Sequence, residues 1–257
     1  IDIVIIINSF YFMIKSIISS IGGLFGKKPK VDCFIIHFNR PSLLDRQLKI
    51  LSLNARLRLY VIDNASVLEN RGKVKSICSQ FGVELIQLER NLGHQVVWLD
   101  DISRAIAKNS PYIVTDCDVL PPEGVDYLSV LEQGLDQYPR VTKVGLELNV
   151  SRIPLDYPRR DEVIHHERGF IYRKPLDGNF QEAPVDTTFA LYRGGYHSYS
   201  VWGTKSNDWG GKCLSLRTVN PALEADHLGW YMVPPYDEET KKYFEIIRGS
   251  ATGHWKQ

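Results

Sequence analysis

The chain has 257 residues, a formal net charge of +1, 44% hydrophobic residues and 24% charged residues. A chain of this length can bury one sizeable core, and its composition is that of a globular protein rather than a disordered or fibrous one. The near-zero charge excludes a protein that attracts nucleic acid through a strongly basic surface. Four cysteines without C-x-x-C spacing disfavour a zinc site and indicate a reducing, cytoplasmic compartment.

The first 30 residues differ from the rest of the chain. Residues 14–25 place large apolar side chains at helical spacing, and Lys27, Lys28 and Lys30 follow them. This pattern is typical of an amphipathic helix at a membrane surface, here a peripheral contact of residues 13–30 with the inner membrane face. The alternative is a loosely attached or frayed helix. Polar residues interrupt 3–25, which disfavours a membrane span. A signal peptide fits poorly because the basic residues come after the apolar run.

From residue 31 onward, predicted strands alternate with predicted helices. Runs rich in Val, Ile, Leu, Phe and Tyr predict strands at 31–38, 57–63, 83–89 and 112–118. Apolar residues at helical spacing predict helices at 41–53, 67–80, 94–108 and 124–138. This alternation predicts an α/β fold of Rossmann-like type, in which helices cover both faces of a mostly parallel central sheet. We expect 31–257 to form a single domain.

The alternation ends after a further predicted strand at 143–150. Residues 151–185 are polar, contain several Pro and Gly residues, and predict a long loop of the kind that often carries function. A strand is predicted at 187–193, followed by a Gly- and Ser-rich loop that extends through residue 220.

Polar residues stand at the end of each of the first four predicted strands or just after it. They are His37 and Asn39, then Asp63 and Asn64, then Asn91, and finally Asp116 and Asp118. The carboxyl ends of parallel strands meet at the edge where such sheets bind ligands, so these side chains should lie together. Residues at i and i+2 share a strand face, and the last two carboxylates could therefore hold one divalent cation that bridges to a phosphate. We expect Asp118 to contribute little to folding.

Several of these segments resemble a known family. The sequences "CFIIHFNRPSLL" at 33–44, "VIDNAS" at 61–66, "NLGH" at 91–94 and "TDCD" at 115–118 resemble the nucleotide-sugar-binding half of family 2-like glycosyltransferases of the GT-A fold. This resemblance covers about 31–150. The sequences "APVDTTFALYR" at 183–193, "HLGWY" at 227–231 and "GHW" at 253–255 are similar to a bacterial subgroup, and 151–257 would form its acceptor and catalytic half.

The resemblance implies a metal-dependent enzyme that moves a sugar from a nucleoside-diphosphate sugar to a glycan or lipid-linked acceptor, as in cell-surface polysaccharide biosynthesis. It implies that His37, Asn39, Asp63, Asn91 and Asp116 bind the nucleotide sugar. Asp63 would contact the nucleobase, Asn91 the base or ribose, and Asp116 the ribose or the metal. Asp118 would bind Mn²⁺ or Mg²⁺, and His254 would supply a further ligand, with His227 as the alternative. The sequence has no Q-x-x-R-W motif, which disfavours processive synthesis.

A transferase that inverts the anomeric centre also needs a base for the acceptor hydroxyl. Asp186 borders the strand predicted at 187–193 and lies in an apolar run, which should fix its position and raise its pKa. His227 precedes the aromatic pair of "HLGWY" and is the second candidate, and Glu224 and Asp226 lie nearby.

Two other classes of protein share parts of this pattern. A nucleotidyltransferase or sugar-nucleotide pyrophosphorylase would carry a glycine-rich loop after its first strand, and residues 37–42 contain no glycine. A non-catalytic nucleotide-sugar-binding module is the other alternative.

Overall fold

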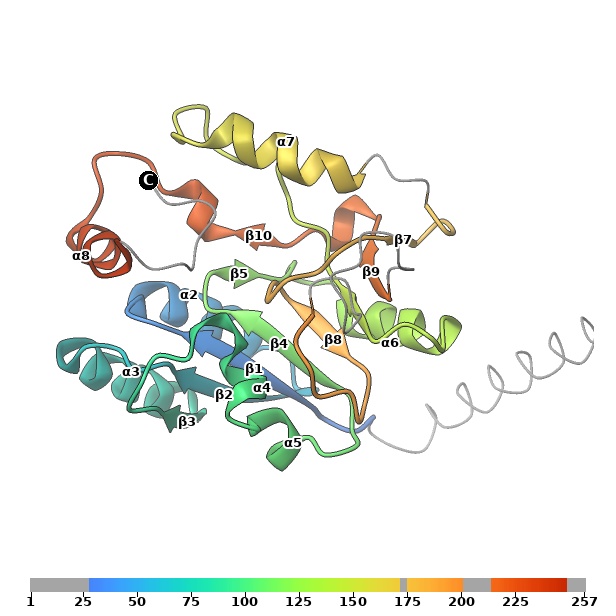
Figure 1. The fold of residues 1–257 in the computed structure, drawn as a ribbon, viewed down its shortest axis with the longest axis horizontal. Helices are drawn as coiled ribbons and strands as arrows, with labels where there is room; N and C mark the ends of the chain where they lie inside the picture. The colour runs from blue at the N-terminus through green and yellow to red at the C-terminus, as the bar shows by residue number, and fades with distance from the viewer. Residues whose placement is uncertain (1–27, 172–174, 201–213, 249–257) are drawn as a thin grey trace, which may run out of the picture. The chain divides into compact units, whose positions relative to one another are not determined.

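The computed structural model of the protein describes residues 28–171, 175–200 and 214–248 (Figure 1). The chain divides into Ile1–Lys30 and Val31–Gln257, and the second unit is described below. The amphipathic segment predicted near the amino terminus falls almost wholly outside the described residues, as does His254. No helix in the described part of the chain is long and apolar enough to cross a membrane.

The first half of the sheet is parallel, as predicted. Its strands lie in the order β3-β2-β1-β4 and span Val31–His37 (β1), Leu57–Asp63 (β2), Glu84–Gln87 (β3) and Tyr112–Asp116 (β4). The strand register aligns His37 with Asp63 and Ile36 with Asp116. The polar residues at the ends of these strands and just after them therefore meet at one edge of the sheet. The α/β class and the mostly parallel sheet are confirmed.

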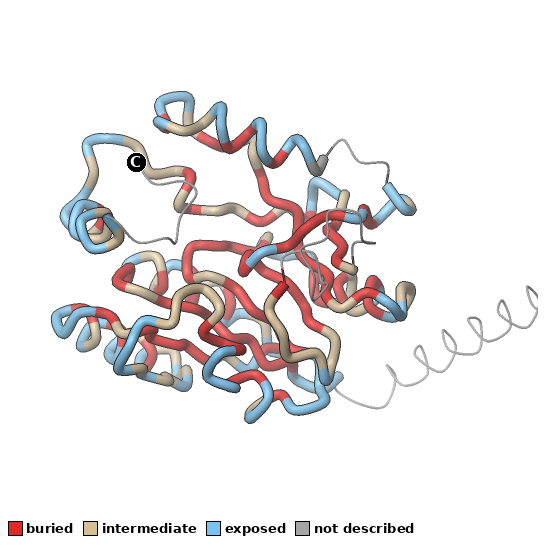
Figure 2. Tube along the Cα trace, in the orientation of Figure 1, coloured by how far each residue is buried: buried red, intermediate tan, exposed pale blue. Residues whose placement is uncertain are grey.

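Helices cover both faces of this sheet. One core forms beneath α2 (Pro41–Leu51), α3 (Leu68–Phe81) and α6 (Tyr127–Gln137), and a second forms beneath α4 (Val96–Leu99) and α5 (Ile102–Ile106). Figure 2 shows the strands buried between helices whose outer faces are exposed. A single helix at 94–108 was predicted and is wrong. A 3-10 turn at Gly93–Gln95 comes first, and Asp101 adopts φ +52°, a left-handed conformation that Asp tolerates but that ends a helix.

The second half of the sheet mixes strand directions. Strand β8 (Ala190–Tyr192) lies antiparallel between β4 and β6 (Lys143–Gly145), and β9 (Ser215–Thr218) and β7 (Phe180–Glu182) complete the order. The strand predicted at 143–150 is thus shorter than expected, since the chain leaves the sheet after Gly145. The loop predicted through residue 220 is also wrong where β9 lies, because that strand is too short to show a pattern.

Residues 151–185 are not one long loop, which corrects the prediction. They contain α7 (Arg160–Ile171) and β7. Helix α7 buries Val163 and Ile164 beside Glu167, and the Glu167 carboxylate accepts a hydrogen bond from the Arg217 guanidinium of β9 at 2.6 Å. Since one of the buried positions is a carboxylate, the sequence lacks the apolar face by which a helix is recognised.

A small second sheet brings the carboxyl-terminal part of the chain to the polar edge. Strand β10 (Asp226–His227) pairs antiparallel with β5 (Val119–Leu120), and His227 lies opposite Val119 (Figure 1). Short 3-10 turns at Pro221–Leu223 and Leu228–Tyr231 flank β10. The last described helix, α8 (Glu238–Ile247), is capped by Asp237, whose side chain accepts a hydrogen bond from the Thr240 N–H.

Candidate functional site

The first part of the polar edge is a buried hydrogen-bond network around Asp63. His37 is fully buried, and its Nδ1 lies 3.1 Å from Asp63 Oδ1. His37 Nε2 accepts a hydrogen bond from the Arg40 N–H, so the imidazole carries its proton on Nδ1 and donates it to Asp63. Burial alone would raise the pKa of Asp63, but the hydrogen bonds from His37 and Ser66 outweigh burial and lower this pKa. His37 therefore acts on the site through Asp63 and the Arg40 backbone.

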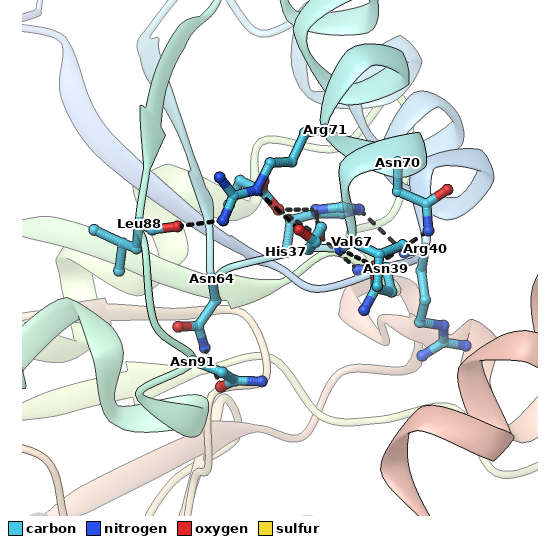
Figure 3. A network of polar contacts seen from close by, with 11 residues as sticks. His37, Asn39, Arg40, Asn64, Val67, Asn70, Arg71, Leu88 and Asn91 are labelled. Atoms are coloured by element: carbon cyan, nitrogen blue, oxygen red, sulfur yellow. Dashed lines mark hydrogen bonds and ion pairs between the residues drawn. The ribbon is translucent and has the colours of Figure 1, made fainter.

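Two asparagines shape the loops of this edge (Figure 3). Asn39 adopts φ +54° and accepts hydrogen bonds at Oδ1 from the Val67 N–H and from Asn70. Asn64 donates to Asn91 Oδ1 at 3.0 Å and accepts from the Leu92 N–H. The loops after β1, β2 and β3 are thereby tied together, with Asn91 exposed at the surface.

The turn that carries Asp116 and Asp118 is fixed from several sides. Strand β4 ends at Asp116, so Asp118 lies in a turn and not on the strand face that the spacing predicted. The amide of Gln47, fully buried on α2, donates to the Asp116 and Val119 carbonyls at 2.7 and 2.6 Å. The Leu228 N–H donates to the Asp118 carbonyl at 2.7 Å.

Thr187 links Asp116 to Asp186. The Thr187 hydroxyl donates to Asp116 Oδ2 at 2.7 Å, and the Thr187 N–H donates to Asp186 Oδ1 at 2.8 Å. The Tyr199 hydroxyl donates to the same Asp186 oxygen at 2.9 Å. Asp186 is exposed, so the apolar residues around it in the sequence do not enclose its carboxylate as expected. Asp116 and Asp186, both predicted as site residues, thus accept hydrogen bonds from the same threonine.

Lys143 fixes the backbone on both sides of the Asp186–Tyr199 contact. Its side chain is fully buried on β6, and its ammonium donates to the carbonyls of Val185 and Ser200. These two residues are the chain neighbours of Asp186 and Tyr199. The sequence offered no signal for this role, because a lysine in a predicted strand normally points to solvent.

Asp118 is buried, contrary to the expectation that it would have little structural role. Its Oδ2 accepts a hydrogen bond from Arg40 Nη1 at 2.7 Å and lies 3.8 Å from His227 Nδ1. Burial alone would raise the pKa of Asp118, but His227 and Arg40 outweigh it and lower this pKa. Asp116 behaves in the opposite way, because burial and then the negative charge of Asp118 raise its pKa well above the usual range.

The described residues contain no group of three or more His, Cys, Asp or Glu side chains arranged to hold a metal ion. The chemistry of the donors at Asp118 nevertheless suits a divalent cation. His227 Nδ1 is buried with no hydrogen-bond partner among the described residues, and it faces a carboxylate oxygen. Mg²⁺ and Mn²⁺ accept carboxylate oxygen, Mn²⁺ accepts imidazole nitrogen more readily, and such ions often bind through one or two carboxylates plus substrate phosphates. The residues present therefore fit the metal that the resemblance implies.

No model of a protein family and no curated protein matches this chain. Among solved structures, the mannosyltransferase PcManGT from Pyrobaculum calidifontis, in complex with GDP-Man and Mn²⁺, is similar over 65% of this chain and 45% of its own, with 16% identity and a TM-score of 0.44. TarS 1-349 of S. aureus is similar over 64% of this chain and 47% of its own, with 13% identity and a TM-score of 0.42. TarS 1-349 in complex with UDP is similar over 64% and 46%, with 12% identity and a TM-score of 0.41. This chain spans less than half the length of each of these three proteins.

Proposed function

We propose that the protein is a non-processive, metal-dependent glycosyltransferase of the GT-A type that takes its sugar from a nucleoside-diphosphate sugar. The observation that carries this proposal is the meeting of Asp116, Asp118, His227 and Asp186 at the carboxyl edge of the sheet, beside the buried Asp63 network. The reaction needs carboxylates for a cation, a carboxylate for the acceptor hydroxyl and polar groups that meet the nucleotide.

The nucleoside is proposed to bind across the ends of β1, β2 and β3. The exposed Asn91 would meet the base or ribose, and Asn39 would shape the loop against which the nucleotide lies. Asp63, which is fully buried, would hold this edge in place through its hydrogen-bond network. His37 would support Asp63 from beneath, since both of its ring nitrogens are already engaged.

Asp116, Asp118 and His227 are proposed to hold a divalent cation. When bound, this cation would neutralise the negative charge that develops on the departing nucleoside diphosphate. His254, which lies outside the described residues, is the alternative third ligand. Mn²⁺ titration of His227→Ala and His254→Ala distinguishes the two, because only loss of a true ligand weakens binding.

Asp186 is proposed to accept the proton of the acceptor hydroxyl. It is exposed to an incoming acceptor, and hydrogen bonds from the Thr187 N–H and the Tyr199 hydroxyl fix one of its oxygens. Among the described residues, the hydrogen bonds to Asp186 all go to that one oxygen, so the second would accept the proton. The acceptor is proposed to be a glycan or a lipid-linked glycan of a cell-surface polysaccharide, which the protein would reach on the cytoplasmic side of the membrane.

The test is a thermal-shift panel of UDP-, GDP-, dTDP- and CMP-sugars with and without Mn²⁺, followed by an assay of nucleoside-diphosphate release with candidate acceptors. A donor at about 100 times its dissociation constant adds about 2.7 kcal/mol of stability, which is easily detected. Asp186→Asn should bind the donor normally and release little nucleoside diphosphate. Donor binding without release in the wild type would instead indicate a binding module. Pyrophosphate-dependent formation of nucleoside triphosphate would indicate a pyrophosphorylase.

A further inference from the structure

The positively charged side chain of Arg40 lies where the metal ion is proposed to bind. The Arg40 guanidinium lies on Asp118, with 2.7 Å between Arg40 Nη1 and Asp118 Oδ2. Both side chains are about nine-tenths buried, so the pair is poorly screened by solvent. Arg40 follows directly from the turn at Asn39, and its side chain extends away from the Asp63 network (Figure 3).

The other contacts of the guanidinium are weak. Arg40 Nη2 donates to the Met232 sulfur at 3.3 Å, and the guanidinium carbon lies 4.7 Å from the centre of the Tyr243 ring on α8. A thioether is a poor acceptor, and a cation–π contact is weaker than a charge-assisted hydrogen bond to a carboxylate. Among the described residues, Asp118 is the only one whose oxygen accepts a hydrogen bond from this guanidinium. The position of Arg40 therefore depends on Asp118.

The guanidinium and a divalent cation require the same oxygen. Asp118 Oδ2 is the atom that Arg40 contacts, and it is also the atom that faces His227 Nδ1. A methyl group added at Gly229 would lie 2.9 Å from this oxygen, so the surroundings are already close-packed. A metal ion bound here next to an unmoved guanidinium would place like charges within a few ångströms in a buried environment, at a large electrostatic cost.

We propose that Arg40 is the counter-ion of Asp118 in the metal-free protein, and that a divalent cation binds by displacing its guanidinium from Asp118 Oδ2. This inference rests on the proposed function. Release of the guanidinium would provide a planar donor for the diphosphate of the nucleotide sugar, since Arg binds phosphate oxygens through two parallel hydrogen bonds. Metal binding alone would then be weak, and metal and donor would bind best together.

The experiment measures the affinity of the full chain for Mn²⁺ alone, by calorimetric titration after removal of bound metals with a chelator. The variants are Arg40→Met, which removes the charge, and Arg40→Lys, which keeps the charge on a differently shaped head group. Met232→Leu is the matched control, because it alters a weak contact of Arg40 and leaves the Arg40–Asp118 pair. Circular dichroism checks that each variant is folded.

We expect Arg40→Met to bind Mn²⁺ at least about tenfold more tightly than the wild type, which corresponds to about 1.4 kcal/mol. Arg40→Lys should bind severalfold more tightly, because an ammonium cannot reproduce the guanidinium contact with Asp118. Met232→Leu should match the wild type. If Arg40→Met does not fold, Arg40→Lys alone decides the question.

Equal Mn²⁺ affinity in the wild type and Arg40→Lys would overturn the proposal that the metal displaces the guanidinium. Arg40 would then weaken metal binding only through the repulsion of its charge. Equal affinity in all variants would overturn the inference and leave the metal site intact. No Mn²⁺ binding by any variant would overturn both the inference and the proposed metal site. Failure of the proposed function would be seen separately, as absence of nucleoside-diphosphate release by the wild type with every donor and acceptor.

Discussion

Isosteric changes at Asp116 and Asp118 should have opposite effects on stability, although the two residues are separated by a single cysteine. Asp118 forms a buried ion pair with Arg40, and its pKa is lowered. Asp116 has a raised pKa, first because of burial and then because of the negative charge of Asp118. Asp118→Asn removes a favourable charge, whereas Asp116→Asn removes an unfavourable one and keeps an oxygen that can accept the Thr187 hydroxyl.

The magnitudes follow from these contacts. Loss of one partner from a buried pair costs about 3–5 kcal/mol, but the amide keeps an oxygen for Arg40, so we expect Asp118→Asn to lose about 2 kcal/mol of unfolding free energy. Asp116→Asn should gain about 0.5–2 kcal/mol of unfolding free energy, which is the usual range for a single stabilising substitution. Both variants should lose at least about a hundredfold in turnover, equivalent to about 2.7 kcal/mol of barrier.

The assay is urea unfolding of the metal-free protein with a chelator present, at neutral pH and at acid pH. The lowered pKa of Asp118 means that its contribution is present above the unfolded pKa of about 4 and is lost as the pH falls through the folded pKa. The raised pKa of Asp116 means that its penalty is absent below about pH 4 and develops as the pH rises toward the folded pKa. Both differences from the wild type should therefore shrink in acid. Changes of the same sign at neutral pH would refute this electrostatic account.

Three further substitutions test the surroundings of the site. Gly229→Ala places a methyl group 2.9 Å from Asp118 Oδ2, so it should weaken Mn²⁺ binding at least about tenfold while leaving the circular dichroism spectrum unchanged. Lys143→Met should lower kcat about tenfold with donor affinity unchanged, because Lys143 fixes the backbone beside Asp186; equal loss of donor binding would argue for a general structural role. Arg217→Met should cost about 3–5 kcal/mol in urea unfolding at neutral pH, since it removes the guanidinium that pairs with the buried carboxylates of Glu147 and Glu167.

The sequence alone predicted the strands and helices that depend on the pattern of neighbouring residues. The apolar runs that form β1, β2 and β4 are long enough to predict strands, and the helix predicted to begin at residue 41 does begin at Pro41. Since parallel strands with helical crossovers present their carboxyl ends at one edge, the polar residues after each strand could be assigned to a common site. Asp63, Asp116 and Asp118 indeed lie along that edge.

Other features depend on contacts between residues far apart in the chain, and only the tertiary structure reveals them. Arg40 meets Asp118 across 78 positions, and His227 reaches Asp118 only because β10 pairs with β5. Helix α7 buries Glu167 against Arg217, so its inward face carries no apolar pattern. Strands such as β7 and β9 are too short for alternation to be visible. Local periodicity reports which side chains face a core, but it carries no information on which buried charge will find which partner.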